Sequence, residues 1–273
     1  MSAASLPHEL DRAVATTLDA DGSRRLELTT EWNTPNGTAN GGYVLAVLAR
    51  AVLDHGGEVA PDHPDLLSVS VNYLKPPSPG PAQVLVETVR IGRRISVHQA
   101  SLVQGGTTVA LGVVTLHDWD APGVDAAYSG LPAPQLPDPD DCLDLTTLVP
   151  AGTVPIIDRY DARGPEAPGW LQGAPTGHPE ATLWARPKDG RRIDALATAA
   201  LVDGYPPVTA ELDLLASATV QLTVHLRRRP DTAWLLMRIS TRHVEGGFHD
   251  EDVDVWDEEG RLVAQSRQLA ILS

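Results

Sequence analysis

Several features that define large classes of proteins are scarce in this sequence. Only one cysteine, Cys142, stands among the 273 residues, so no disulfide can form within the chain. We expect Cys142 to be structural or incidental, because its acidic and proline-rich surroundings would not activate a thiol. No run of about 18 apolar residues occurs, as a membrane-spanning helix would require. The opening MSAASLPHELDR lacks the basic flank and apolar stretch of a secretory signal, and we therefore expect a cytoplasmic protein.

Positive charge is also in short supply. Against 36 Asp and Glu the chain has 21 Lys and Arg, which gives a formal net charge of −15 and a pI near 4.9. A phosphate backbone or an anionic membrane would be repelled by the protein as a whole. We therefore expect neither a nucleic acid nor a membrane as a partner.

Common catalytic and cofactor motifs are missing as well. The sequence has no Gly-x-Ser-x-Gly, no Gly-x-Gly-x-x-Gly after a strand, no phosphate-binding loop and no Cys or His pairs with zinc spacing. The run His249-Asp250-Glu251-Asp252 could suggest a metal, but alternate residues of a strand point to opposite faces. We interpret that run as a solvated strand end, and we expect neither a metal nor a cofactor.

What the sequence does have is an internal repeat. At an offset of about 150 residues, 68–117 and 218–272 share one plan: a strand, a basic or proline turn, two alternating strands, a glycine turn and a final strand. An apolar helical stretch precedes each, 41–57 with Asn40 as its N-cap and 194–205 with Asp194 as its N-cap. Because neither copy could easily bury its helix alone, we expect two fused copies that share one sheet, with the functional site at their seam.

The expected architecture is α+β. Each of the two repeats has one apolar helix wrapped by an antiparallel sheet, and this arrangement is a double hotdog. We place the first repeat at 1–120 and the second at 180–273. Residues 121–179 are rich in proline and lack periodicity, so we interpret them as a linker between the repeats. The expected strands lie at 67–74, 83–91, 96–104, 107–117, 181–186, 217–226, 234–243, 248–256 and 262–272.

Short motifs add a likeness to a known family. Gly41-Gly42 opens the first apolar helix, Arg90 to Ser96 reads Arg-Ile-Gly-Arg-Arg-Ile-Ser, and the following strand ends in Gln104-Gly-Gly. In these features the chain resembles the acyl-CoA thioesterase II family of double-hotdog enzymes, which carries a Gly-Gly pair, an Arg-x-Gly-x-x-x-Ser turn and a Gln-Asn-Gly at the same places.

The second half continues the resemblance. Asp203 stands at the end of the second helix, where the family has its catalytic aspartate, and Thr223 falls on the strand that carries the family's Ser or Thr. Gln268 ends Leu-Val-Ala-Gln-Ser-Arg-Gln, similar to the family's Leu-Val-Ala-Ser-x-x-Gln. The Pro-rich connection departs strongly from the family, which affects the acyl-chain pocket more than the chemistry.

The resemblance implies hydrolysis of an acyl-CoA thioester to the free acid and coenzyme A. Asp203 would accept a proton from the attacking water, while Thr223 and Gln268 would hold that water in place. We further expect the backbone N–H groups of Gly41 and Gly42, at a helix N-terminus, to face the thioester carbonyl oxygen.

Several assignments stay open. Arg93, Arg94 and Arg227 could meet the phosphates of coenzyme A or could belong to solvated turns. Asp54 occupies the place of Asp203 in the first repeat, but we expect it to be structural because Thr and Gln partners are missing there. The alternatives are a non-catalytic acyl-CoA-binding or assembly protein and a hotdog hydratase or dehydratase that would use His55 beside Asp54. We also expect a homo-oligomer.

Overall fold

A single curved sheet organises the molecule. The computed structural model describes residues 8–124, 126 and 128–272, and within these residues the strands form one 14-stranded sheet. Its order is β1-β2-β4-β5-β6-β3-β10-β14-β13-β11-β9-β8-β7, with β12 paired to β13. The strands of the first half are β1 (Thr17–Leu18), β2 (Arg24–Leu28), β3 (Asp65–Tyr73), β4 (Gly80–Ile91), β5 (Ile95–Gln104) and β6 (Thr107–His117).

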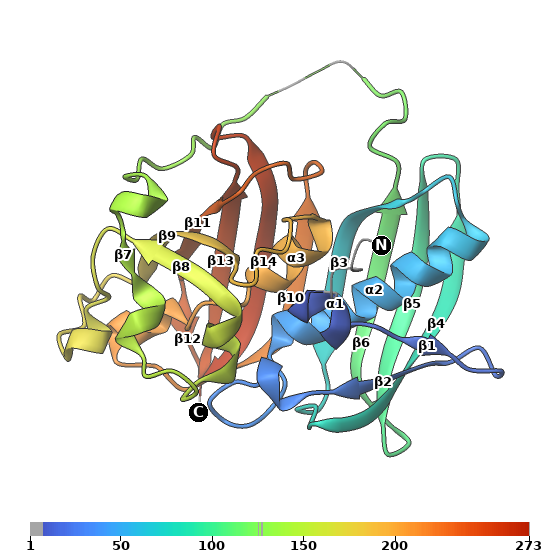
Figure 1. Ribbon diagram of the computed structural model, residues 1–273, viewed down its shortest axis with the longest axis horizontal. Helices are drawn as coiled ribbons and strands as arrows, with labels where there is room; N and C mark the ends of the chain where they lie inside the picture. The colour runs from blue at the N-terminus through green and yellow to red at the C-terminus, as the bar shows by residue number, and fades with distance from the viewer. Residues whose placement is uncertain (1–7, 125, 127, 273) are drawn as a thin grey trace, which may run out of the picture.

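The second half has the same plan. Its strands are β7 (Leu143–Asp144), β8 (Tyr160–Gly164), β9 (Glu180–Pro187), β10 (Ser217–Leu226), β11 (Leu235–Ser240), β12 (Val244–Glu245), β13 (Phe248–Trp256) and β14 (Leu262–Leu272). The two halves meet where β3 and β10 pair antiparallel, with Val71 opposite Leu222 (Figure 1). The predicted α+β double hotdog is confirmed, because one sheet runs through both repeats and each half wraps its own helix.

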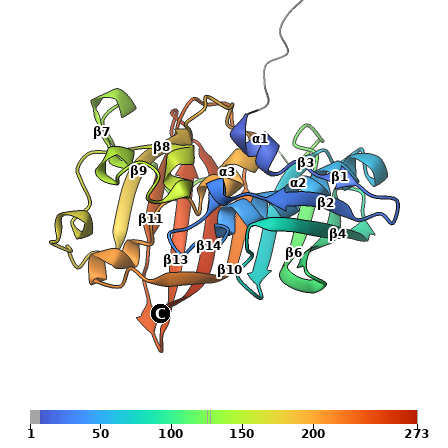
Figure 2. The same cartoon turned by 60° about the horizontal axis from the view of Figure 1, so that its bottom comes forward.

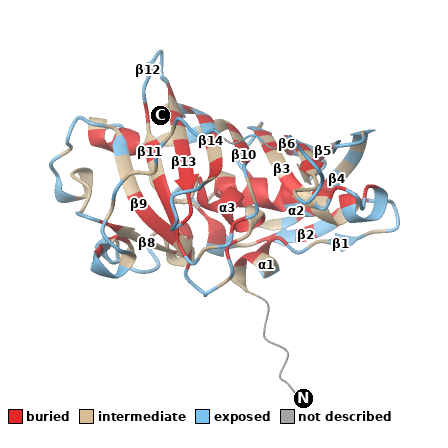
Figure 3. Ribbon diagram, turned by 90° about the horizontal axis from the view of Figure 1, so that it is seen from above, coloured by how far each residue is buried: buried red, intermediate tan, exposed pale blue. Residues whose placement is uncertain are grey.

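The helices α2 (Gly41–Val59) and α3 (Ala195–Leu201) lie on the concave face of the sheet, while α1 (Glu9–Ala13) lies beside them (Figure 2). Residues of α2 are buried on almost every side, so that this helix forms the centre of the core (Figure 3). The expected N-caps are confirmed: Asn40 Oδ1 accepts from Tyr43 N at 3.0 Å and Asp194 Oδ1 from Ala197 N at 2.8 Å. None of the helices in the described part of the chain is long and apolar enough to cross a membrane.

A close contact between α2 and α3 depends on a glycine. An ideal Cβ built on Gly42 would lie 2.3 Å from the carbonyl oxygen of Ala200, which is too close for any real side chain. With hydrogen in that place, the N-terminus of α2 can approach the C-terminal end of α3. This contact joins the two repeats and positions the residues that follow α3.

The connection between the repeats is more ordered than a plain linker. Its strand β8 extends the sheet edge, with Ala162 opposite Ala185 of β9. Farther upstream, Cys142 packs with Trp184, Trp234 and Trp256 in a small apolar cluster, and Trp184 Nε1 donates to the carbonyl of Pro137 at 2.9 Å. These tryptophans lie on the outer face of the sheet, so part of the connection covers that face. Residues 125 and 127 of the expected linker lie outside the described residues.

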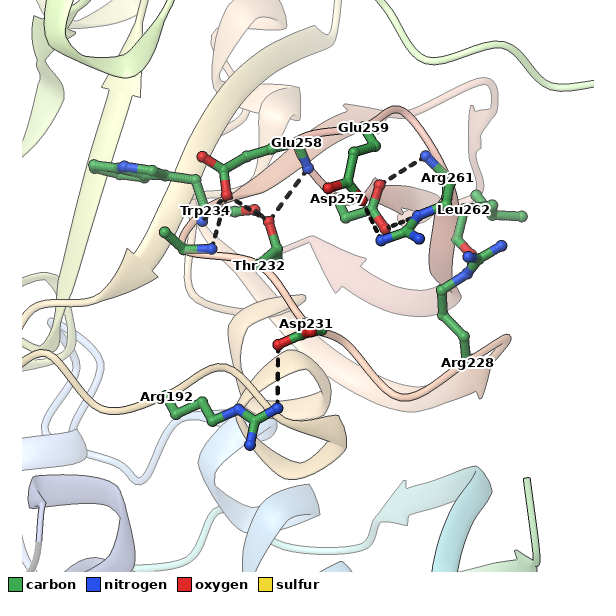
Figure 4. A network of polar contacts seen from close by, with 11 residues as sticks. Arg192, Arg228, Asp231, Thr232, Trp234, Asp257, Glu258, Glu259, Arg261 and Leu262 are labelled. Carbon is green, nitrogen blue, oxygen red and sulfur yellow. Dashed lines mark hydrogen bonds and ion pairs between the residues drawn. The ribbon is translucent and has the colours of Figure 1, made fainter. Parts of the chain in front are cut away.

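A polar network closes the turn between β13 and β14 (Figure 4). The buried Asp257 accepts from the backbone N–H and from Nε of Arg261, both at 2.8 Å. Glu258 Oε2 accepts from Thr232 Oγ1 at 2.7 Å and from Ala233 N at 2.8 Å, which ties the turn to the segment before β11. The network therefore anchors one end of the two strands whose other ends carry the polar residues described below.

Candidate functional site

The site is organised around Asp203, directly after α3. Its Oδ2 accepts a hydrogen bond from Gly42 N at 2.8 Å and from Asn40 Nδ2 at 2.9 Å, at the N-terminus of α2. Asn40 Nδ2 also donates to the backbone carbonyl of Asp203 at 2.8 Å. A carboxylate from the second repeat is thus held by the positive end of the helix of the first repeat.

The surroundings of Asp203 set its proton affinity. Removal from water raises the pKa of this carboxyl to about 6, while hydrogen bonds from Gly42, Asn40 and Gly41 act in the lowering direction. Tyr73 Oη donates to the carbonyl of Gly41 at 2.6 Å, and burial followed by the charge on Asp203 keeps the pKa of Tyr73 well above its ordinary value. Asp203 is therefore poised to take up a proton near neutral pH, whereas Tyr73 stays protonated.

Gln268 lies on the sheet face that the helices cover. In β14 it stands opposite Leu222 of β10 and opposite Glu251 of β13. Cross-strand partners share a face, and Leu222 is a core residue that is 1% exposed. The Gln268 carboxamide has no hydrogen bond to any described residue, so no contact among these residues fixes which way its oxygen and its N–H groups point.

Thr223 does not join this group, which corrects the sequence expectation. Its neighbours Leu222 and Val224 are 1% and 0% exposed and point into the core, so the Thr223 side chain points the opposite way. There its Oγ1 lies 2.8 Å from Ser70 Oγ of β3, and its partner in β14 is the exposed Arg267. Thr223 and Gln268 therefore lie on opposite faces of the sheet.

The hydroxyl on the correct face belongs to Thr219. The pairing of β10 with β14 is interrupted by a bulge between Thr219 and Gln221, so that Thr219 stands opposite Ala270 while Leu222 stands opposite Gln268. Because Ala270 and Gln268 point the same way in β14, Thr219 is on the inner face as well. It is half-buried, and its hydroxyl has no partner among the described residues. Sequence reasoning missed this residue.

The two glycines also act differently from the expectation. The N–H of Gly42 is taken by Asp203, and the carbonyl of Gly41 is taken by Tyr73. An N–H already bonded to a carboxylate is not free to receive a thioester carbonyl oxygen. The expected oxyanion-binding role is therefore corrected for Gly42, whose N–H holds the carboxylate of Asp203 in place.

The arginines expected near coenzyme A lie at the far end of the sheet. Arg94 is in the turn before β5, and its carbonyl oxygen contacts His117. His117 stands opposite Asp65, so this turn lies at the end of the sheet where β3 begins. Arg227 follows β10 at the same end and bonds to Gln265 at 2.9 Å. The Asp203 group lies near Tyr73, at the other end of β3 and roughly 26 Å away by strand rise. The structure does not bring Arg93, Arg94 or Arg227 to the site.

The run at 249–252 is not a solvated strand end, which corrects another expectation from the sequence. Alternate residues of the run do point to opposite faces of the sheet, but His249 and Glu251 are 1% and 5% exposed and face the core. His249 Nε2 lies 2.7 Å from Ser217 Oγ, and Glu251 Oε2 accepts from Val208 N at 3.0 Å. The described residues contain no cluster of His, Cys, Asp and Glu that could hold a metal ion.

The first repeat has no equivalent group. Asp54 pairs with Arg50 at 2.6 Å and lies 3.9 Å from Arg24. His55 Nε2 contacts Thr88 Oγ1 at 2.9 Å. No hydrogen bond joins Asp54 to His55 among the described residues, so this place lacks the Asp-His pair that a hydratase would use.

Known proteins match both halves of the chain. A family model described as the acyl-CoA thioesterase N-terminal domain matches residues 28–117, and one described as the C-terminal domain matches residues 139–272. The chain belongs to the acyl-CoA thioesterase family. An uncharacterized protein of Mycobacterium tuberculosis is 33% identical over 265 residues, which span 90% of this thioesterase-family chain and 89% of the relative.

Solved structures agree with this family. A thioesterase II candidate from Thermobifida fusca has a TM-score of 0.82 and 30% identity, with 98% of this chain and 99% of that chain covered. An acyl-CoA thioesterase II from Mycobacterium marinum, at 20% identity, has a TM-score of 0.72 and covers 97% of this chain and 98% of its own. The second of these supports the fold of this thioesterase-family protein.

Proposed function

We propose that this protein hydrolyses an acyl-CoA thioester, with a water molecule held between Asp203 and Thr219 and with Gln268 facing the thioester carbonyl oxygen. One observation carries the proposal: a carboxylate with a raised pKa stands at the N-terminus of α2, while a carboxamide and a hydroxyl that bond to none of the described residues lie on the inner face of the sheet. A site for water attack needs such a base together with groups that orient the water.

The reaction balances with these groups alone. Asp203 takes a proton from the water while the water oxygen adds to the thioester carbonyl carbon. The carbon–sulfur bond then breaks, and the departing thiolate takes the proton that Asp203 has received. Thr219 orients the water, and the Nε2 donors of Gln268 are available to the carbonyl oxygen as negative charge develops there. Neither step requires a metal or a cofactor.

The test uses two matched pairs of variants. Purified protein is mixed with acyl-CoAs of several chain lengths, and released thiol is followed with a thiol reagent. Asp203→Asn should lower kcat by about 10²- to 10⁴-fold, the contribution usual for a general base, whereas Asp54→Asn should leave it within a few fold.

The second pair separates the two threonines. Thr219→Val should cost about 10- to 100-fold, the value of one hydrogen bond to a charged or reacting group, whereas Thr223→Val should cost little. Equal losses at both threonines, or full activity in Asp203→Asn, would refute the arrangement. Far-ultraviolet circular dichroism of each variant checks that folding is intact.

A non-catalytic acyl-CoA-binding or assembly protein is the second candidate function. The observation that favours it is that part of the Pro-rich connection covers the outer sheet face through the cluster around Cys142. In that case acyl-CoA would bind, as measured by calorimetry, without release of thiol at any chain length. A hydratase has less support, because His55 contacts Thr88 and not Asp54.

We also propose that the protein associates with copies of itself. Apolar side chains stand exposed along β4 of the first half, among them Leu85 at 48%, Val89 at 60% and Ile91 at 51%. Exposed apolar surface of this kind is typical of protein interfaces. A homo-oligomer is therefore our expectation, and sedimentation analysis would measure its size. Its location in the cytoplasm remains an expectation from the sequence.

A further inference from the structure

A second carboxyl group lies inside the site without a role in the reaction above. Glu251 stands directly opposite Gln268 on the inner face, so the Cβ atoms of this cross-strand pair are expected about 5 Å apart. Its Oε2 accepts from Val208 N, at the start of the 3-10 helix η6 (Val208–Leu212), which follows Asp203 by a few residues. Oε1 has no hydrogen-bond partner among the described residues.

The charges around Glu251 disfavour its ionised form. Asp203 approaches from the end of α3, Asp250 is its neighbour in β13, and Tyr205 faces it from the segment before η6. Arg267 and Asp252 form an ion pair on the opposite face of the sheet. No Lys, Arg or His forms an ion pair with Glu251 in the described part of the chain.

The proton on Glu251 follows from this environment. Burial, the largest effect, acts together with the charges of Asp203 and Asp250 to raise the pKa of Glu251 to about 8, against the lowering effect of the Val208 N–H. Below that pH Glu251 is an uncharged carboxyl group, and such a group has an O–H to donate.

We propose that Glu251 is a positioning residue: its O–H donates to the carboxamide oxygen of Gln268 and so turns the amide N–H groups toward the substrate. This inference rests on the proposed function. A carboxamide without a fixed partner can take two orientations that exchange its oxygen and nitrogen. A neutral acid on the neighbouring strand selects one of them, in the way that outer groups orient the ligands of other sites.

Loss of the Glu251 proton should undo this arrangement. A carboxylate can only accept, so the amide of Gln268 would turn its N–H groups toward Glu251 and its oxygen toward the substrate carbonyl. A second negative charge would also lie near Asp203. Hydrolysis should therefore decline on the alkaline side with a midpoint near the pKa of Glu251, mainly through kcat and with little change in KM.

The decisive variant is Glu251→Gln, which cannot ionise but can still donate an N–H. We expect its kcat at pH 7 to stay within about threefold of the wild type and its alkaline decline to vanish. Glu251→Leu should lose about 10- to 100-fold in kcat at every pH. Asp252→Asn is the matched control, because it alters the next residue of β13 on the opposite face and should keep the alkaline decline. Thermal unfolding of each variant identifies any loss that comes from folding.

A second readout does not depend on turnover. The side-chain amide resonance of Gln268, assigned by its loss in Gln268→Leu, should shift with a midpoint near pH 8 in the wild type and stay constant in Glu251→Gln. An alkaline decline that persists in Glu251→Gln, or an amide resonance that is insensitive to pH, overturns the positioning role. If the wild-type protein releases no thiol from any acyl-CoA, the proposed function falls, while the resonance still decides whether Glu251 orients Gln268.

Discussion

Alanine at Gly42 should destabilise the protein, whereas alanine at Gly57 of the same helix should stabilise it. A Cβ at Gly42 would meet the carbonyl oxygen of Ala200 at 2.3 Å and the Cβ of Asp203 at 3.0 Å. At the exposed Gly57, no heavy atom would lie within 4 Å of the added carbon. The same chemical change therefore tests the contact between α2 and α3 against a position in α2 that has no contact.

The magnitudes follow from opposing effects. Alanine in place of glycine favours a helix by about 0.5–1 kcal/mol, and at Gly57 that gain stands alone. At Gly42 the obstructing atom is backbone, so the two helices must separate, and overpacking of this kind costs about 1–3 kcal/mol. Displacement of the Gly42 N–H from Asp203 weakens a hydrogen bond to a charged group, worth about 1.5–3 kcal/mol when lost completely. We expect a net loss of roughly 2 kcal/mol or more.

Thermal unfolding measures both effects. For a chain of this size about 1 kcal/mol corresponds to about 2–4 °C, so Gly42→Ala should lower Tm by roughly 4–8 °C and Gly57→Ala should raise it by a few degrees. Hydrolysis should also fall in Gly42→Ala, since Asp203 would be displaced. An unchanged Tm and unchanged activity in Gly42→Ala would mean that α2 and α3 are not in this close contact.

Three further predictions concern pH and charge. Because Asp203 must be ionised to act as a base and its pKa is raised to about 6, hydrolysis should fall about tenfold per pH unit below pH 6, and a flat profile down to pH 5 would contradict this. Asn40→Ala removes a donor that lowers the pKa of Asp203, so the acid side of the same profile should move to higher pH. Burial, then the charges of His55 and His63, lower the pKa of His98 below 6.5. The stability that neutral His98 provides is therefore complete above pH 6.5 and is lost as the pH falls through its folded value; His98→Gln should weaken the dependence of Tm on pH in that range.

Much of the fold could be predicted from the spacing of apolar residues. The alternation in 262–272 gives the bounds that β14 has in the structure, and the N-caps Asn40 and Asp194 mark the starts of α2 and α3. These features are local, since a strand period of two and an N-cap depend on a few neighbouring residues. The pairing of β3 with β10 could be inferred from the repeat, because two open sheet edges of similar units can join.

The threonine assignment shows where local reasoning fails. The apolar residues Leu222, Val224 and Leu226 alternate inward, which by itself places Thr223 on the outer face. A regular alternation would put Thr219 on that outer face too, four residues earlier. The bulge between Thr219 and Gln221 changes the phase, and no glycine or proline in the sequence marks it. Only the register with β14 shows which hydroxyl faces Gln268.

The role of the glycine pair could not be read from the sequence for a different reason. Gly42 and Asp203 are 161 residues apart, and their hydrogen bond depends on how α2 crosses α3. The position of Glu251 could not be read from the sequence either. It belongs to an acidic run typical of solvated strand ends, but it is buried against η6. Burial of a charged residue depends on tertiary packing, and local composition does not report it.

Duplication of the hotdog unit does not duplicate the site, and the helix N-caps give the physical reason. Asp203 follows the N-cap Asp194 by nine residues, and the residue at the same distance from the N-cap Asn40 is the buried Ala49, which has no carboxylate. Counted from the helix caps, Asp54 is therefore not the counterpart of Asp203, as the repeat offset had suggested. The caps themselves differ in what they can hold. The Asn40 amide caps α2 with its oxygen and gives its N–H groups to Asp203, whereas Asp194 is an acceptor that already binds Ala197 N and Arg191. A carboxylate brought to the start of α3 would meet a like charge instead of a donor, so a chain of this design supports one base at one end of the seam.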